Sequence, residues 1–461
     1  MITNEVKQAR FSENFKYIIN SDGQRVELHD SGIVHILTIG MSPYSSAIIS
    51  NLYQKNNLKC RIIGGADTLT LQYAKNFCSG RECLPCAAIT GATIKDILNN
   101  REKDEISIYY NLDQDGPCQN GAWPLVWETF ARRINFKNVI FCAQPTARNN
   151  FLGLGIKFVV ALTFAIIMGD LLDEAENTIK CIGHGKDEIL RKFEIETDLL
   201  IENIKDGVWA IKPALKNWAE KMSQMPCMGT IKEIPKVLIF GGLNVIFLHN
   251  PITNFFIEQG IIPKVVDFTE GASWIASEHV MRYGLMRGWI TPEKQFNLIL
   301  IFLSYLFRKE NRKEALSAIK SRVALAVVDL YKRRYRKIMK KSGLLFDRHI
   351  SFPRIVREGH KYVSFNGYSE TPVTTGRYIC SIKAGVFDGL INLGSFNCQP
   401  AMNSQAIIRP LANRSSIPYV SIDCEGPWIS TNQRKLLEVV AVQARRVCED
   451  KLSKTFQFLL F

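Results

Sequence analysis

Three cysteines lie in sequence surroundings where a thiolate could bind a metal. Cys83 opens a Cys-Leu-Pro-Cys run, Cys118 ends a Gly-Pro-Cys run, and Cys398 is the centre of a Phe-Asn-Cys-Gln-Pro run. Each is in a turn between an expected strand and an expected helix, and the carboxyl ends of parallel strands meet at one edge of a sheet. Thiolates bind soft metals, and the negative charge of a four-iron cluster is favoured by helix amino termini. We therefore predict an iron–sulfur site on these cysteines, with one iron left open for substrate.

The other cysteines leave alternatives open. The chain has twelve cysteines, and free cysteine is often buried, so Cys60, Cys142, Cys181 and Cys448 are expected to be core thiols. A zinc site is a second alternative, although the Cys-x-x-Cys run at 83–86 lacks the second Cys/His pair usual in structural zinc sites. A redox-active pair at the same run is a third alternative.

Length and composition indicate a large globular protein. Of the 461 residues, 46% are hydrophobic and 22% are charged. A chain of this length is longer than one hydrophobic core usually supports, so two or three domains are expected. Residues 1–10 do not have the pattern of a secretory leader. Without a leader, the twelve cysteines are expected to be free thiols or metal ligands in a reducing compartment, where disulfides are rare. We expect a cytoplasmic protein.

One apolar segment is long enough to cross a bilayer. Residues 151–168 read FLGLGIKFVVALTFAIIM, with Lys157 near the middle. A lysine in a spanning helix costs roughly 3 kcal/mol on insertion scales, and no second span follows. We therefore expect a buried core helix and no membrane partner.

Positive charge is concentrated in residues 308–341, which hold thirteen Lys/Arg against three acidic residues, within a net charge of +14 for the chain. Apolar residues recur there at helical spacing, which indicates a helix with a solvated basic face. An acidic partner, a phosphate-bearing ligand such as coenzyme A, or nucleic acid remains an alternative, with nucleic acid disfavoured because no binding motif accompanies the charge.

Alternation of strands and helices predicts an α/β fold: two Rossmann-like parallel-sheet domains with additional helical segments, and the cluster cleft between the domains. The first domain is expected at 1–150 and carries Cys83 and Cys118. The expected parts that follow are a helical segment at 151–222, a linker at 223–235, and a second domain at 236–461 with a helical insertion at 274–341 and Cys398. Strands are predicted at 33–39, 60–63, 106–110 and 138–143, and then at 236–240, 245–248, 263–267, 389–393 and 419–422.

Several motifs resemble those of one family. Residues 369–377 are similar to its Gly-Glu-x-x-x-x-Thr-Gly-Glu motif, and residues 395–400 to its Gln-Pro-Phe-Gly-Cys-x-Pro motif. Residues 423–433 resemble its Asp-Tyr-Asp-Pro-Gly motif followed by Asn-Gln, while 83–91 and 116–119 resemble its two upstream cysteine motifs. The chain thus resembles, over nearly its whole length, the activase-related proteins of the 2-hydroxyacyl-CoA dehydratase superfamily, which match the carboxyl-terminal part of large CoA-enzyme activases.

The resemblance implies a four-iron four-sulfur cluster held by Cys83, Cys118 and Cys398. In the family, such a protein receives low-potential electrons from a separate activator ATPase, and its reaction is a 2-hydroxyacyl-CoA dehydration or the reduction of a small molecule at a double-cubane cluster. The double-cubane form takes six thiolates, for which Cys86, Cys424 and Cys78 are the additional candidates. A homo- or heterodimer is implied, and an acyl-CoA or another small molecule is the implied substrate.

An alternative of another class remains. The upstream cysteine motifs differ from those of the family at Leu84, Cys86, Pro117 and Gln119. Such departures are expected if the chain is a clusterless interaction or regulatory protein whose basic helix binds a partner. No residue is assigned a catalytic role. Glu370 is the first carboxylate to test, although a helix cap or a surface acid is its more ordinary role.

Overall fold

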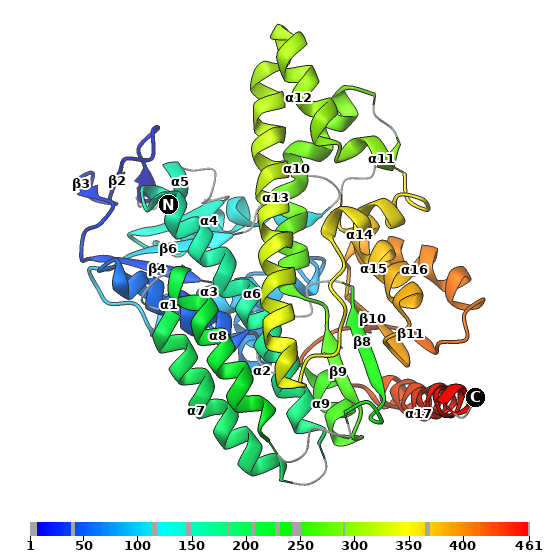
Figure 1. Cartoon of the computed structure of the whole chain (residues 1–461). Helices are drawn as coiled ribbons and strands as arrows, with labels where there is room; N and C mark the ends of the chain where they lie inside the picture. Colours follow the sequence, from blue (N-terminus) through cyan, green and yellow to red (C-terminus); the bar gives the residue numbers. More distant parts are fainter. Residues whose placement is uncertain are drawn as a thin grey trace.

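The computed structural model describes residues 7–37, 42–111, 118–143, 149–182, 185–204, 208–225, 231–241, 250–288, 291–364 and 369–459. Its core is two sheets, each of four parallel strands flanked by helices (Figure 1). The predicted α/β fold class is thereby confirmed, with two units compatible with Rossmann-like domains.

The first sheet has the strand order β5-β4-β6-β7, formed by Ile33–Leu37 (β4), Lys59–Ile62 (β5), Ile106–Asn111 (β6) and Val139–Ala143 (β7). All residues of β6 are buried, because helices cover both faces of a parallel sheet. The strands start within one residue of the predicted positions. Residues 38–39, the end of the first predicted strand, lie outside the described residues.

Four helices belong to this first unit: Pro43–Lys55 (α1), Thr68–Lys75 (α2), Leu84–Asn99 (α3) and Trp123–Arg133 (α4). Prolines in the first turns of α1, α3 and α4 suit helix starts, because the missing N–H would have no intrahelical partner. Asp67 caps α2 by accepting a hydrogen bond from the Thr70 main-chain N–H at 2.6 Å.

The second sheet has the order β11-β10-β8-β9, formed by Lys236–Phe240 (β8), Ile262–Val265 (β9), Gly389–Ser395 (β10) and Tyr419–Cys424 (β11). One face packs on Pro251–Glu258 (α9) and Thr431–Leu459 (α17), and the other on Thr371–Ala384 (α15) and Gln399–Ala412 (α16). The strand predicted at 245–248 lies outside the described residues.

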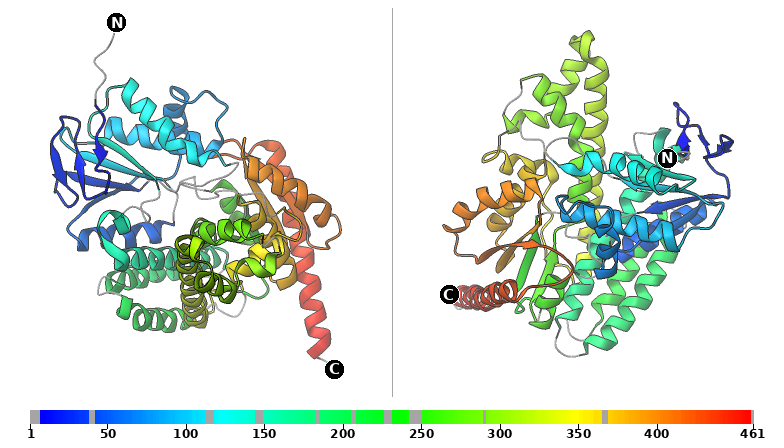
Figure 2. Two further views of the ribbon diagram at one scale, coloured as in Figure 1. Left: turned by 90° about the horizontal axis from the view of Figure 1, so that it is seen from above. Right: turned by 180° about the vertical axis from the view of Figure 1, so that it is seen from behind.

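Helices between the two sheets occupy the middle of the sequence. They are Asn149–Leu152 (α5), Gly155–Lys180 (α6), Lys186–Ile204 (α7), Val208–Ser223 (α8), Phe268–Met286 (α10), Pro292–Gln295 (α11), Leu298–Phe307 (α12), Arg312–Met339 (α13) and Phe352–Gly359 (α14). Figure 2 shows the blue-cyan and orange-red units side by side, with the green helices against both. The helical insertion predicted at 274–341 is longer, since α10 begins at Phe268 and α14 follows α13.

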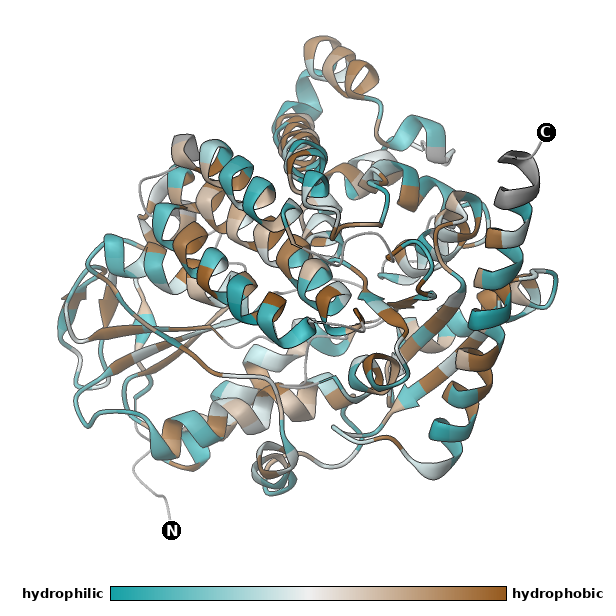
Figure 3. Ribbon diagram, turned by 60° about the horizontal axis from the view of Figure 1, so that its bottom comes forward, coloured by the Kyte–Doolittle hydropathy of each residue, from teal (hydrophilic) through white to brown (hydrophobic). Residues whose placement is uncertain are grey.

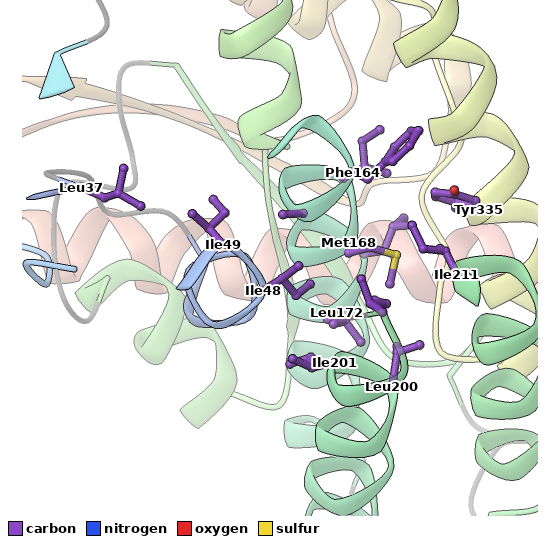
Figure 4. Close-up of a cluster of buried hydrophobic side chains, with 14 of the residues drawn as sticks. Leu37, Ile48, Ile49, Phe164, Met168, Leu172, Leu200, Ile201, Ile211 and Tyr335 are labelled. Atoms are coloured by element: carbon purple, nitrogen blue, oxygen red, sulfur yellow. The ribbon is translucent and has the colours of Figure 1, made fainter. Parts of the chain in front are cut away.

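The largest hydrophobic core lies around α6. Phe164 and Met168 of α6, Ile48 of α1, Ile211 of α8 and Tyr335 of α13 are buried together (Figure 4). Within the described residues α6 is the one helix long and apolar enough to cross a membrane, and about half of its most apolar window is buried. α6 thus packs against α1, α8 and α13 in one core, and the rest of the described chain has a mixed α/β organisation.

A small antiparallel sheet precedes both units and was not predicted. It is formed by Arg10–Phe11 (β1), Tyr17–Ile19 (β2) and Arg25–Glu27 (β3). The turn between β2 and β3 places Gly23 at φ 84°, a conformation that favours glycine. Strands of two or three residues are too short for hydrophobic alternation to reveal.

Candidate metal centre

Cys83 immediately precedes α3. Its backbone is extended (φ −65°, ψ 152°), its side chain makes no capping hydrogen bond, and Pro85 lies in the first turn of the helix. Only 5% of the residue is exposed. Burial raises the pKa of the Cys83 thiol, and the main-chain N–H of Cys86 opposes that rise. The thiol is therefore next to the positive end of a helix dipole.

Cys118 has the same relation to α4. It precedes the single 3-10 turn Gln119–Ala122 (η1), which leads directly into α4, and it makes no side-chain cap. Burial, with a further contribution from the Glu370 carboxyl, raises the pKa of the Cys118 thiol to about 12, while the Asn120 main-chain N–H acts in the other direction. The Gly-Pro pair at 116–117, which the sequence motif includes, lies outside the described residues.

Cys398 precedes α16 at the carboxyl edge of the second sheet. The chain leaves β10, passes Asn397 at φ 58° and reaches Cys398. Asparagine is one of the few residues that adopt this left-handed conformation readily. Burial raises the pKa of the Cys398 thiol, Glu370 adds to the rise, and the Ala401 main-chain N–H opposes it. All three predicted ligands thus lie at helix amino termini.

Two hydrogen bonds join the three cysteine turns. The main-chain N–H of Cys83 donates to Oε1 of Gln119 at 3.1 Å, which ties the start of α3 to the Cys118 turn. The main-chain N–H of Leu84 donates to the carbonyl of Phe396 at 3.0 Å, which ties it to the Cys398 turn. Leu84 also packs in the hydrophobic core of the second sheet. The two units therefore meet where the cysteines lie.

Glu370 is the group that the three thiols share. It immediately precedes α15, and its Oε1 lies 4.0 Å from the Sγ atom of Cys398. Its charge also acts on Cys83 and Cys118. Its Oε2 is shielded from solvent and has no hydrogen-bond partner among the described residues, and burial raises the pKa of the carboxyl. The structure thus brings three thiols and one carboxyl together.

The additional candidates divide into two places. Cys86 is buried on α3 with Sγ 4.0 Å from Oγ1 of Thr90, and Cys83 and Cys78 both act on its thiol. Burial and the Glu82 charge raise the pKa of Cys78 to about 11. These two thiols are therefore neighbours of Cys83, on the side of α2 and α3.

Cys424 is placed differently. It ends β11, is buried in the core of the second sheet, and its carbonyl accepts a hydrogen bond from the Phe396 N–H at 2.9 Å. Burial, followed by the charge of Asp423, raises the pKa of its thiol to about 12. Cys424 is therefore linked to the candidate site by this main-chain hydrogen bond to the Cys398 turn.

The cysteines predicted as core thiols have that character. Cys142 is buried, Sγ of Cys181 donates to the Ile261 carbonyl at 3.3 Å, Sγ of Cys448 donates to the Glu233 carbonyl at 3.5 Å, and Cys60 is half-buried on β5. Every cysteine in the described ranges is a free thiol. Across those same ranges, no three His, Cys, Asp or Glu side chains are close enough to hold a single metal ion. In a four-iron cluster, by contrast, each thiolate binds a different iron.

A buried charge network lies behind the site and was not predicted. Arg377, two turns after Glu370 on α15, pairs with Glu270 at 3.1 Å and Asp347 at 2.7 Å. Further buried ion pairs continue the network through α6, β9, α10 and α13, by way of Glu174, Lys264, Asp267, Lys332 and Arg336. The sequence signal that could have revealed the network is Glu174, an acidic residue within the apolar α6. A charge on a buried helix needs a partner of opposite charge.

The network also changes the interpretation of the basic segment at 308–341. Lys332 and Arg336 are buried and pair with Asp267 and Glu174, so they are not part of a solvated basic face. Most of the remaining cations of the segment lie on the surface of α13 or at its ends.

No family model and no curated protein matches the chain.

Proposed function

We propose that the chain is an iron–sulfur protein of an ATP-coupled, low-potential electron-transfer system. Cys83, Cys118 and Cys398 would hold a four-iron four-sulfur cluster. When bound, such a cluster supplies one-electron chemistry at an iron that the protein does not ligate. The observation that carries the proposal is the meeting of three thiols from two units around one carboxyl, each thiol at a helix amino terminus.

The donor set fits a cluster in composition and in electrostatics. Three thiolates and a carboxylate would together place several negative charges in a partly buried site, where isolated charges are costly. Iron would supply the compensating positive charge. Main-chain N–H groups of Cys86, Asn120 and Ala401 already act on the thiols in the sense that favours thiolates.

The protein groups around the thiols have separable roles in this proposal. Gln119 and the Phe396 carbonyl hold the cysteine turns in register. Glu370, whose pKa is raised by burial, lies beside Cys398 and would be the group that exchanges a proton with a substrate oxygen. The main-chain N–H groups at the starts of the helices that follow Cys83, Cys118 and Cys398 would stabilise the negative charge of the thiolates and of the cluster.

The electron donor and the compartment belong to the same proposal. A separate activator ATPase would deliver the electrons, as the resemblance of the sequence motifs implies. The substrate would be an acyl-CoA or another small molecule, the assembly a homo- or heterodimer, and the location the cytoplasm, where thiols stay reduced.

Metal content after anaerobic purification tests the proposal. About four irons with matching acid-labile sulfide per chain, and an electron paramagnetic resonance signal after dithionite reduction, are expected for one cluster. About eight irons would indicate the double-cubane form, with Cys86, Cys78 and Cys424 as additional ligands. Absence of iron after reconstitution would favour a clusterless interaction protein and contradict the proposal.

A further inference from the structure

The helical insertion ends in a helix whose outer surface is apolar. α12 reads LILIFLSYLF, contains no charged residue, and lies at the end of the hairpin that projects from the sheets in Figure 1. Ile299 is 70% exposed and Phe307 80% exposed. Figure 3 shows the end of this hairpin coloured as hydrophobic. Contiguous apolar surface of this kind marks an interaction site on a globular protein.

Only one side of α12 is covered by the rest of the described chain. Ile301 is fully buried and packs in one core with Phe296 and with Ala315 and Ala318 of α13. The exposed large side chains are Leu298, Ile299, Phe302, Leu303, Leu306 and Phe307. At about 100° per residue they span half of the helix circumference. The exposed surface is therefore broad and convex rather than a narrow seam for one partner helix.

Cations lie at the carboxyl-terminal end of this apolar surface. Arg308 and Lys309 follow α12 directly, and Arg312 and Lys313 begin α13. All four are exposed, with Glu310 as the acidic residue among them. Lysine and arginine beside an exposed apolar helix favour its contact with a membrane that carries anionic lipid, because each cation near such a surface adds electrostatic attraction to apolar burial.

A small hollow beside α12 is lined by two arginines. It has a volume of about 260 Å³ and is lined by Arg287, Leu303, Ser304, Phe307 and Arg308. The Nε and Nη2 atoms of Arg287 have no hydrogen-bond partner among the described residues, and its guanidinium lies over the ring of Tyr283 at 5.6 Å. Two guanidinium groups suit a phosphate, and the adjoining Leu303 and Phe307 suit hydrocarbon attached to it.

We propose that the end of the α12–α13 hairpin binds the surface of a membrane that contains anionic lipid. A headgroup phosphate would occupy the hollow between Arg287 and Arg308, while Ile299, Phe302 and Phe307 enter the boundary of the acyl chains. α12 has ten residues, about 15 Å of helix against roughly 30 Å of hydrocarbon, so it lies on the bilayer rather than across it. The sequence expectation of no membrane partner considered spanning segments and did not include such a surface.

Vesicle co-sedimentation of the full chain tests this proposal. The parent is expected to sediment with vesicles of phosphatidylcholine mixed with phosphatidylserine, less with phosphatidylcholine alone, and less at high salt. The variant I299S/F302S/F307S should need at least about tenfold more lipid for half-maximal binding. Arg287→Gln should need about fivefold more.

A matched control is available on α17, where Leu436, Val439 and Val442 are also exposed. The variant L436S/V439S/V442S makes the same number of apolar-to-serine changes at exposed helix positions outside the proposed surface and should bind vesicles as the parent does. Failure of the parent to bind either vesicle, or equal losses in both triple variants, would overturn the proposal. So would a protein dimer, seen by analytical ultracentrifugation, that the α12 triple variant dissociates, because the surface would then bind a second copy.

Discussion

The Sγ atom of Cys398 lies 4.0 Å from Oε1 of Glu370, so a thiol at the edge of the second sheet faces a carboxyl that also acts on two thiols from the first unit. The two residues come from different turns, before α16 and before α15. For the proposed cluster, the carboxyl would be either a neighbour or a ligand, and these two roles predict different behaviour on substitution.

Glu370→Gln should keep nearly the parental iron content. Clusters of this kind take thiolate ligands, and the amide preserves the shape of the carboxyl while removing its ability to ionise. Iron and acid-labile sulfide per chain are the measurements, with Cys398→Ala as the comparison. Loss of iron in Glu370→Gln as complete as in Cys398→Ala would mean that Glu370 is a required ligand.

Gln119→Ala should release iron to a chelator faster than the parent, by roughly fivefold. The substitution removes the acceptor for the Cys83 N–H, and one such hydrogen bond contributes about 1 kcal/mol. Gln399→Ala is the matched control, because Gln399 also follows a site cysteine and is exposed, but among the described residues its side chain bonds to Asn403 and not to a cysteine turn. Equal release rates in both variants would show that Gln119 does not position the Cys83 turn.

Arg377→Met should lower the free energy of unfolding by about 3–5 kcal/mol. It leaves the carboxylates of Glu270 and Asp347 buried without their shared cation. Denaturant unfolding measures the change. Arg357→Met, at an exposed position on the neighbouring α14, should alter the free energy of unfolding by less than about 0.5 kcal/mol. A small effect at Arg377 would show that the ion network contributes little to stability.

Asp170 should give a measurable pH dependence to stability. Burial and the nearby charge of Asp267 raise the pKa of its carboxyl to about 6, although it accepts hydrogen bonds from the N–H groups of Phe268 and Thr269. A raised carboxyl pKa favours folding while the group is protonated, and that contribution is lost as the pH rises from the unfolded pKa towards the folded one.

The parent should therefore lose stability relative to Asp170→Asn between about pH 4 and pH 6, by at most about 1.4 kcal/mol per pH unit. Denaturant unfolding of both proteins across this range gives the difference. A difference that stays constant with pH would contradict a raised pKa for Asp170.

Strand positions could be predicted from the sequence because buried parallel strands such as β6 and β10 are short apolar runs with helices between them. The three cysteine turns were predictable for the same reason, since each follows a strand or precedes a proline-bearing helix start. The contacts between turns were not. Gln119 reaches Cys83 across 36 residues and Arg377 reaches Glu270 across 107, and a single sequence carries no local signal for pairs so far apart.

The outer surface of α12 was missed for a different reason. Its residues have the composition of a buried helix, and only the surrounding structure reveals that one side lacks a covering element among the described residues. The basic segment shows the reverse case. Lys332 and Arg336 are residue types usually found on a solvated surface, yet they are buried and pair with Asp267 and Glu174.

Iron and acid-labile sulfide per chain, measured after anaerobic purification of the parent and its cysteine variants, test the central claim most directly. The parent should hold about four irons, Cys83→Ala, Cys118→Ala and Cys398→Ala should each lose most of them, and Cys448→Ala, which removes a thiol bonded to the Glu233 carbonyl, should keep them. Equal iron in all four variants, or no iron in the parent after reconstitution, would contradict a cluster held by these three thiols.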